Sequence, residues 1–240
     1  MPRVGTRKLY HILQDDLREL GVGRDKLFSI LKANQLQIIP KRSYHITTDS
    51  HHRFRKHKNS VAQLPIVRPE QVWVSDITYI GNRTNPIYLA LVTDAYSKKI
   101  VGHDVSSSLC TTGSLRALSM ATKSRSYKKE ELIHHSDRGL QYCSDDYQKL
   151  LEKRNIKCSM TESYDPYANA VAERINGILK QEFLGYDRKL PISIMKRLVK
   201  DSVRIYNEIR PHYSCHMLTP KQMHRQNEIK MRTYKNKKQC

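Results

Sequence analysis

The chain has 240 residues, of which 38% are hydrophobic, enough to build one catalytic-size domain and a small appendage. Lys and Arg number 43 against 23 Asp and Glu, a formal net charge of +20, which favours a polyanionic partner such as nucleic acid. No run approaches the roughly 18 apolar residues of a membrane span, and no apolar signal-peptide region opens the chain. The five cysteines are scattered without a CxxC pair, which argues against a disulfide framework or zinc site and predicts a cytoplasmic protein.

The first 39 residues are expected to form a helix-turn-helix-like segment. Residues 5–20 place leucine and isoleucine at helical spacing, and after a glycine-containing turn Leu27, Phe28 and Leu31 share one face of a second short helix. Such a segment either contacts DNA or packs as an appendage. Between residues 40 and 70 the periodicity disappears and basic residues prevail, which predicts a linker that lies along a phosphate backbone.

The sequence between residues 71 and 226 predicts the main domain. Residues 72–80, 87–94 and 98–106 are expected to form three antiparallel strands, followed by a helix that Thr111 or Thr112 begins. A strand over 132–137, a helix capped by Ser144 and a strand over 156–160 complete the pattern. This order predicts a ribonuclease-H-like α/β fold, a five-stranded mixed sheet flanked by helices. A basic tail covers 227–240.

Three acidic residues stand where proteins usually place apolar or neutral side chains. Asp76 interrupts the apolar strand WVSDITYI, Asp137 ends the segment ELIHHSD, and Glu173 lies within NAVAERINGILK. A carboxylate in such a position costs free energy unless it is paired or holds a metal. Asp94 and Asp104 lie near turns, where Asp commonly caps the chain or faces water, so we leave both out of the predicted site.

The helix that carries Glu173 is expected to begin between Asp165-Pro166 and Asn169, because Asp is a good N-cap and proline fits the first turn. At 100° per residue, one narrow polar stripe opposes its apolar face and contains Asn169, Glu173, Asn176 and Lys180. Lys180 lies two turns, about 10 Å, beyond Glu173. We therefore expect Lys180 to be available to a phosphate.

This residue set suits phosphodiester chemistry. Two Mg²⁺ ions about 3.5–4 Å apart can clamp the attacking and leaving oxygens of an in-line displacement. Magnesium prefers hard oxygen ligands from a few carboxylates, with water and substrate completing the octahedron. We predict that Asp76 is shared between two Mg²⁺ ions, with Asp137 on one and Glu173 on the other, and that Mn²⁺ can substitute.

Four segments in this order resemble the transposases of bacterial insertion sequences: WVSDITYI, HHSDRGLQY, NAVAERINGILKQEF and YNEIRPHYSCHMLTP. These enzymes belong to the superfamily of DDE transposases and retroviral integrases. The chain more closely resembles the second-reading-frame, OrfB-type product of the group encoded by two overlapping frames. The likeness covers about residues 72–226, and residues 5–60 resemble the short helix-turn-helix segment of that group. Retroviral integrases carry a zinc module with paired cysteines, which this chain lacks.

The resemblance implies that the catalytic, metal-binding acids fall on Asp76, Asp137 and Glu173. It places a DNA contact on Lys180, and Arg210 either contacts phosphate or supports the catalytic helix. We expect further DNA contacts from residues beside the acids, namely Arg138, Asn169 and Asn176.

The reaction implied by the resemblance is hydrolysis at the 3′ end of the element, followed by attack of the freed 3′-hydroxyl on another phosphodiester. In this group one end is first joined to the other, and the resulting circle is later inserted into target DNA. The implied partners are terminal repeats, target DNA, further copies of the chain that hold two ends together, and an upstream-frame helix-turn-helix protein.

Three alternatives remain open from the sequence. A catalytically inactive DNA-binding repressor could use the same basic scaffold, and a ribonuclease-H-like nuclease could use the same acids, because fold alone does not fix the substrate. An inactive relic of a mobile element is the third. Loss of cleavage on replacing Asp137 with Asn separates an enzyme from a repressor, and joining of a pre-cut 3′ end separates a transposase from a nuclease.

Overall fold

The computed structural model describes residues 3–38, 57–81, 86–161, 169–185 and 190–232. Much of the predicted linker, the Asp165-Pro166 helix start and the end of the basic tail lie outside these residues. One five-stranded sheet forms the centre of the molecule, made of β1 (Val72–Gly81), β2 (Pro86–Asp94), β3 (Ile100–Ser106), β4 (Leu132–Ser136) and β5 (Ile156–Met160). Its order is β3-β2-β1-β4-β5.

The pairing of the strands makes the sheet mixed, as predicted. The pairs β1–β2 and β2–β3 are antiparallel, whereas β1–β4 and β4–β5 are parallel. The third strand begins at Ile100 and not at residue 98, because Asp94 and Lys99 pair through their backbones and Lys98 takes a left-handed φ of 64° in the turn. The other four strands match their predicted ranges to within one residue at each end.

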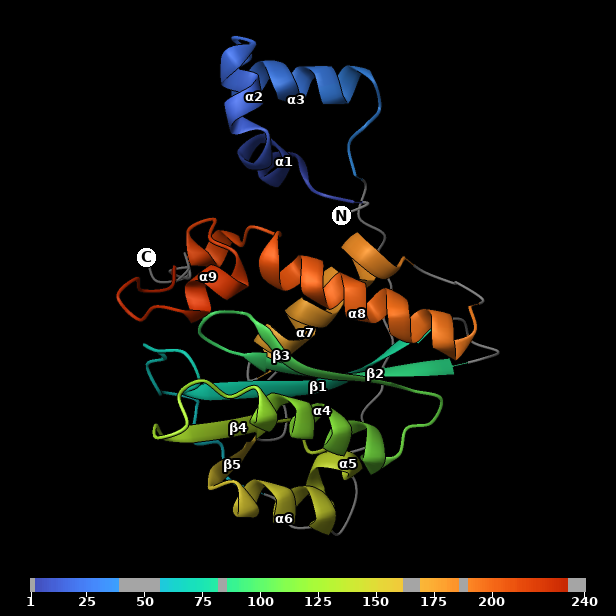
Figure 1. Ribbon diagram of the computed structural model, residues 1–240, viewed down its shortest axis with the longest axis vertical. Coiled ribbons are helices and arrows are strands. Elements are labelled where there is room, and N and C mark those ends of the chain that lie inside the picture. Colours follow the sequence, from blue (N-terminus) through green and yellow to red (C-terminus); the bar gives the residue numbers. More distant parts are fainter. Residues whose placement is uncertain (1–2, 39–56, 82–85, 162–168, 186–189, 233–240) are drawn as a thin grey trace, which may run out of the picture.

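Helices cover both faces of the sheet (Figure 1). On one face lie α7 (Ala170–Ile178), its π-helical continuation (Leu179–Leu184), α8 (Ile192–Glu208) and α9 (Pro220–His224). On the other face lie α4 (Thr111–Lys123), α5 (Leu140–Cys143) and α6 (Asp145–Lys153). Each side has its own apolar core, one including Leu89 and Leu179 and the other including Trp73 and Leu118. The alternating strand residues therefore divide between two cores, as expected for a sheet buried on both faces.

The N-terminal segment contains three helices, not the two predicted: α1 (Thr6–Ile12), α2 (Gln14–Glu19) and α3 (Arg24–Ala33). The helix expected over 5–20 breaks at Leu13, whose φ and ψ of −95° and 13° end α1. The predicted apolar residues still converge, since Leu17, Leu27 and Leu31 form a small buried cluster. The break turns the chain so that Leu9 and Leu13 pack against that same cluster.

Two helix starts differ in detail from their predictions. Helix α4 begins at Thr111 with Cys110 as its N-cap residue, so neither threonine caps it. Ser144 precedes α6 as predicted, but its hydroxyl donates to the Gln141 carbonyl and does not cap the helix. Helix α9 begins at Pro220, and Thr219, its N-cap residue, forms a capping box with Gln222.

Within the described residues, no helix combines the length and the apolar character needed to span a membrane. The cysteines of this part of the chain, Cys110, Cys143, Cys158 and Cys215, are free thiols, as the scattered spacing predicts.

Gly102 of β3 is the point where α4 approaches the sheet most tightly. A Cβ atom added there would lie 2.1 Å from the Ala117 carbonyl oxygen, which belongs to the helix backbone. We expect Gly102→Ala to lower the free energy of unfolding by about 1–3 kcal/mol, the usual cost of overpacking. Gly177→Ala is the control, because a Cβ there meets nothing within 4 Å and alanine favours a helix interior. Urea denaturation of both variants tests this, and equal stabilities would contradict it.

Candidate active site

Two of the predicted acids lie on neighbouring strands of the sheet. Asp76 is in the middle of β1, and Asp137 directly follows β4. The register pairs Ser75 with Ser136, so the two aspartates occupy the next positions on adjacent parallel strands. Adjacent strands lie about 4.8 Å apart. The parallel pairing therefore brings two carboxylates, 61 residues apart in sequence (137 − 76), to one place.

Glu173 reaches the same place from helix α7, which packs against β1. Burial, together with the negative charges of Asp137 and Glu173, raises the pKa of Asp76 from 3.8 to about 7. The charges of Asp137 and Glu173 therefore both act on Asp76. The structure brings the three predicted catalytic residues together, although they come from three different elements.

Asn176 and Asn169 hold the catalytic helix against β1. The side chain of Asn176 donates to Asp76 Oδ2 at 2.8 Å, and that of Asn169 donates to the Ser75 carbonyl at 3.1 Å. Both asparagines are buried, with exposed fractions of 3% and 6%. In this structure they position Asp76 and α7, and their predicted contact with DNA stays a prediction.

Asp137 is held by the loop that follows it. The Gly139 N–H donates to Asp137 Oδ1 at 3.0 Å, and a Cβ on Gly139 would lie 3.0 Å from that same oxygen. The absence of a side chain at Gly139 thus allows the backbone to approach the carboxylate closely. Arg138, between these residues, is half-buried, and its DNA contact stays a prediction.

Lys180 lies in the π-helical continuation of α7 and is half-buried. Burial lowers its pKa, while the negative charge of Asp76 raises it. The ammonium group of Lys180 is therefore close enough to interact with Asp76, as the predicted polar stripe of the helix led us to expect. A phosphate bound near Asp76 could be contacted by Lys180.

Arg210 lies in a buried ion pair with Glu182. Its side chain is 1% exposed and makes two hydrogen bonds to Glu182, each 2.7 Å long. Lys8 of α1 donates to the same carboxylate at 2.8 Å. Glu182 belongs to the continuation of α7, so Arg210 holds this helix in the structure, and its role in DNA binding or catalysis stays a prediction.

The two aspartates left out of the predicted site are engaged elsewhere. Asp94 is fully buried and accepts hydrogen bonds from the backbones of Glu70 and Ser97. Asp104 makes a two-point hydrogen-bonded pair with Arg116. Both carboxylates therefore have structural partners, in agreement with their exclusion.

Tyr142 is a residue of the site that sequence analysis missed. It lies on α5 and is 3% exposed, and burial raises its pKa well above 10.0, with smaller contributions from Tyr147, Asp76 and Asp137. Within the described part of the chain its hydroxyl has no hydrogen-bond partner. The segment HHSDRGLQY contained the signal, since Tyr142 follows Asp137 by five positions, but the fold was needed to direct it inward.

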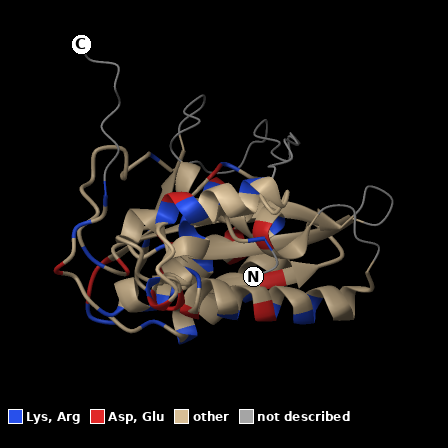
Figure 2. Cartoon of the chain, turned by 90° about the horizontal axis from the view of Figure 1, so that it is seen from above, with Lys and Arg blue, Asp and Glu red and all other residues tan. Residues whose placement is uncertain are grey.

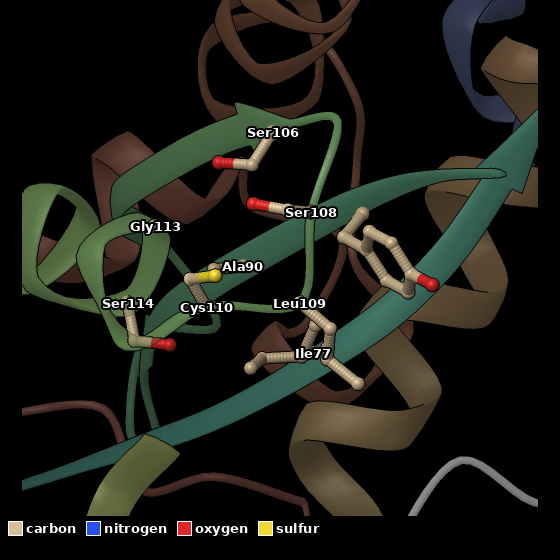
Figure 3. Close-up of a pocket in the computed structure, with 9 residues that line it drawn as sticks. Ile77, Ala90, Ser106, Ser108, Leu109, Cys110, Gly113 and Ser114 are labelled. Carbon is tan, nitrogen blue, oxygen red and sulfur yellow. The ribbon is translucent and has the colours of Figure 1, made fainter. Parts of the chain in front are cut away.

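The opposite face of β1 offers little room for a substrate. A cavity of about 10 Å³, enough for a single water, lies between Ile77 of β1, Ala90 of β2 and the start of α4. Figure 3 shows the hydroxyls of Ser106, Ser108 and Ser114 around it.

The three acids have the chemistry of a divalent-cation site. Among the described residues, no three His, Cys, Asp or Glu side chains are gathered tightly enough to hold a metal as they stand. Mg²⁺ does not need such a cage, since it commonly binds one or two carboxylates together with waters and substrate phosphates. Asp76 is hard to ionise, because it is buried and feels the charges of two other acids, and a bound cation would stabilise its charged form. The hydroxyl of Tyr142, which has no hydrogen-bond partner among the described residues, also fits such a site.

The raised pKa of Asp76 predicts how the metal-free protein responds to pH. Because the folded-state pKa of about 7 exceeds the ordinary 3.8, the stabilising effect is complete below pH 3.8 and is lost as pH rises through 7. We expect the free energy of unfolding to fall across this range by a few kcal/mol. Urea denaturation at stepped pH in EDTA measures it. Asp76→Asn is expected to flatten the dependence, and an unchanged profile would contradict the assignment.

Comparison with known proteins identifies the family. The family described as "Integrase core domain" matches residues 67–166, and a second model of that description matches 154–220. The insertion element IS600 uncharacterized 31 kDa protein of Shigella sonnei is 34% identical over 223 residues, covering 90% of this chain and 79% of that protein. The chain belongs to the bacterial insertion-sequence transposases.

Other transposases of the family match a shorter segment. Transposase InsF for insertion sequence IS3fB of Escherichia coli (strain K12) is 35% identical over 160 residues, which are 66% of this chain and 55% of that protein. The match to InsF thus spans about half of its length. The predicted transposase family and integrase core are confirmed.

Solved structures confirm the fold. The cryo-EM structure of the simian T-cell lymphotropic virus intasome with PP2A regulatory subunit B56 gamma aligns with a TM-score of 0.58 at 18% identity, covering 96% of this chain and 78% of that chain. The HTLV-2 integrase catalytic core domain in complex with magnesium gives a TM-score of 0.49 at 17% identity, covering 66% of this chain and 98% of that one. With the five-stranded mixed sheet, the first alignment confirms the predicted ribonuclease-H-like architecture.

Proposed function

We propose that this transposase cleaves and joins DNA strands with Asp76, Asp137 and Glu173 as its catalytic acids. The observation that carries the proposal is the parallel register that sets Asp76 beside Asp137, with the helix of Glu173 packed against the same strand. The raised pKa of Asp76, which has the charges of both other acids among its causes, supports it. Three carboxylates so placed repel one another, and a divalent cation would relieve that repulsion. The family supplies the reaction class, and the cluster supplies the place where it occurs.

The cation we propose is Mg²⁺, with Mn²⁺ able to replace it. A pair of ions would be held by Asp76 in common, with Asp137 and Glu173 each completing one side. When bound, the ions would neutralise charge on the phosphate and favour ionisation of the attacking water or 3′-hydroxyl.

The chain's own residues keep the acids in place for this chemistry. Asn176 fixes the carboxylate of Asp76 from the catalytic helix, and the Gly139 N–H fixes that of Asp137. Holding reacting groups in a prepared geometry lowers the barrier by removing the entropy cost of assembling them. Lys180 and Arg138 are the side chains we propose to contact the DNA backbone beside the reacting phosphate.

We assign the reaction to residues 71–226, with residues 1–39 as a DNA-binding or packing segment and 40–70 and 227–240 as basic connections. The substrates are the terminal repeats of an element and its target DNA. Because two ends must be held together, the working form is expected to contain more than one copy of the chain, in the bacterial cytoplasm. The upstream-frame helix-turn-helix partner stays a prediction.

Strand joining is the decisive measurement. A duplex with a pre-cut terminal repeat and a free 3′-hydroxyl is incubated with the protein, Mg²⁺ and a target duplex, and products are resolved on a denaturing gel. Joined strands are expected. Hydrolysis alone would favour a ribonuclease-H-like nuclease, and binding without either product would favour a repressor. Omitting Mg²⁺ is the control, and joining of equal yield without any divalent ion would contradict the metal assignment.

A further inference from the structure

A pocket of about 490 Å³ opens away from the catalytic acids. Its walls come from the turn before β3, the segment between α4 and β4, the last turns of α8, and α9. Four separate parts of the chain thus converge on one hollow. Most small-molecule pockets are predominantly apolar, whereas this one is lined mainly by polar and charged residues.

The lining carries an excess of positive charge. Lys99, Arg204, Lys221 and Arg225 contribute cations, and Glu208 is the acidic residue among the lining residues. Glu208 pairs with Lys221 at 2.7 Å, so these two charges neutralise each other. The other three cations of the lining, Lys99, Arg204 and Arg225, make up the positive excess. Burial lowers the pKa of Lys99, the charges of Glu70 and Asp94 raise it, and those of Lys221 and Arg225 lower it. The cations therefore lie close enough to repel one another.

Buried ionisable side chains form the floor of the pocket. His224 is buried, with Nε2 3.4 Å from Glu70 and Nδ1 3.7 Å from Asp94. These two carboxylates raise the pKa of His224, which favours the positively charged ring. Arg125 lies 3.4 Å from Glu70, and Tyr127 donates to the His224 carbonyl at 3.1 Å. Glu70 and Asp94 thus interact with His224 beneath the pocket and with Lys99 in its lining, while Arg204 and Arg225 add to the positive charge of the lining.

The position of the pocket separates it from the acids. The register pairs Asp94 with Trp73 near the start of β1, and Lys99 lies in the turn that follows Asp94. Asp76 lies three residues further along β1, roughly 10 Å away. Asp137 follows Ser136, the partner of Ser75, so it leaves β4 beside Asp76 and at a similar distance from this turn. A phosphodiester held by the acids is therefore not the group that this pocket would meet.

We propose that the pocket formed by Lys99, Arg204, Lys221 and Arg225 binds DNA backbone phosphates other than the one that the acids would hold. It rests on the proposed function, since it assumes that the chain handles DNA. Arginine and lysine recognise phosphate by charge and hydrogen bonding without reading sequence. Figure 2 shows Lys and Arg along the helices and the C-terminal segment, with Asp and Glu between them. The excess of positive charge at the pocket therefore comes from the meeting of cations from separate parts of the chain.

The test removes the charges and measures the salt dependence of binding. The full chain and the variant Lys99→Gln/Arg225→Gln are titrated against a fluorescent duplex of mixed sequence at several salt concentrations. Lys153→Gln/Arg154→Gln is the matched control, because it removes one exposed lysine and one exposed arginine at the end of α6 on the other side of the sheet. Removing one cation that binds a phosphate lowers the magnitude of the slope of log K against log salt by about 0.9, so a fall of about 1.8 is expected for the pocket variant. The control is expected to keep the wild-type slope.

Three outcomes would overturn the proposal. The first is a pocket variant with the slope of the control. The second is an equal fall in both variants, which would mean unspecific attraction by net charge. The third is an unchanged DNA slope together with a loss of inorganic phosphate binding, measured by calorimetry, which would make the pocket a small-anion site. The proposed function is judged separately, since Asp76→Asn is expected to lose strand joining and keep the full salt slope.

Discussion

Asp76→Asn is expected to lower the rate of strand joining by on the order of 10³-fold, the effect of removing a major electrostatic contributor from a reaction centre. Asn keeps the shape of the side chain and can still meet Asn176, but it cannot supply the shared negative charge. The protein should remain folded, because the change removes a carboxylate that Asp137 and Glu173 make costly to ionise. Joining of a pre-cut 3′ end in a single turnover measures the rate.

The control for Asp76→Asn is Asp201→Asn, an exposed aspartate on α8. It removes the same charge from the surface and is expected to leave joining unchanged. Mg²⁺ should raise the melting temperature of the wild type and of Asp201→Asn, but not that of Asp76→Asn, because ligands that bind the native state stabilise it. A variant at Asp76 that joins strands at the wild-type rate would remove this residue from the catalytic set.

Arg210→Ala is expected to lower the free energy of unfolding by about 3–5 kcal/mol, the cost of breaking a buried ion pair from one side. The variant leaves Glu182 with Lys8 and without the two hydrogen bonds from the guanidinium. Because Glu182 continues α7, strand joining should fall as well. Chemical denaturation and the joining assay measure the two effects.

The matched controls for Arg210→Ala separate a structural role from a DNA contact. Lys157→Ala breaks the exposed pair with Glu131 and should change stability little, as is usual for surface ion pairs. The double variant Arg210→Met/Glu182→Gln should recover much of the stability, since both buried charges are gone. An Arg210→Ala protein that is as stable as the wild type but binds DNA poorly would restore the predicted phosphate contact.

The strands and most helices of the domain were predictable because each has a local signal. The alternation of apolar residues along 72–80 reflects burial on both faces, and Thr219-Pro220 carries a capping signal that the structure uses. Helix α8 was not predicted, although its residues pack their apolar side chains against the core. Helix α5 was also missed, and its four residues are too short for a periodic pattern.

The candidate site was predictable in composition but not in contacts. A charge inside an apolar strand marks Asp76 on its own, and the motif order marks Asp137 and Glu173. The stripe on α7 predicted that Asn176 and Lys180 share one side, but not that Asn176 would be buried against Asp76. Helical spacing gives the direction of a side chain, whereas the neighbour it meets depends on how closely the helix approaches the sheet.

The sequence by itself determined the class of the molecule: its polyanionic partner, its strand order along the chain, and the three acids that mark the family. The tertiary structure alone decided that parallel pairing of β1 with β4 sets two distant aspartates side by side, that Arg210 is buried against Glu182, and that four cations gather around one pocket. The reason is physical. Periodicity and capping act between residues a few positions apart, whereas burial and charge interaction depend on distances in space that only folding establishes.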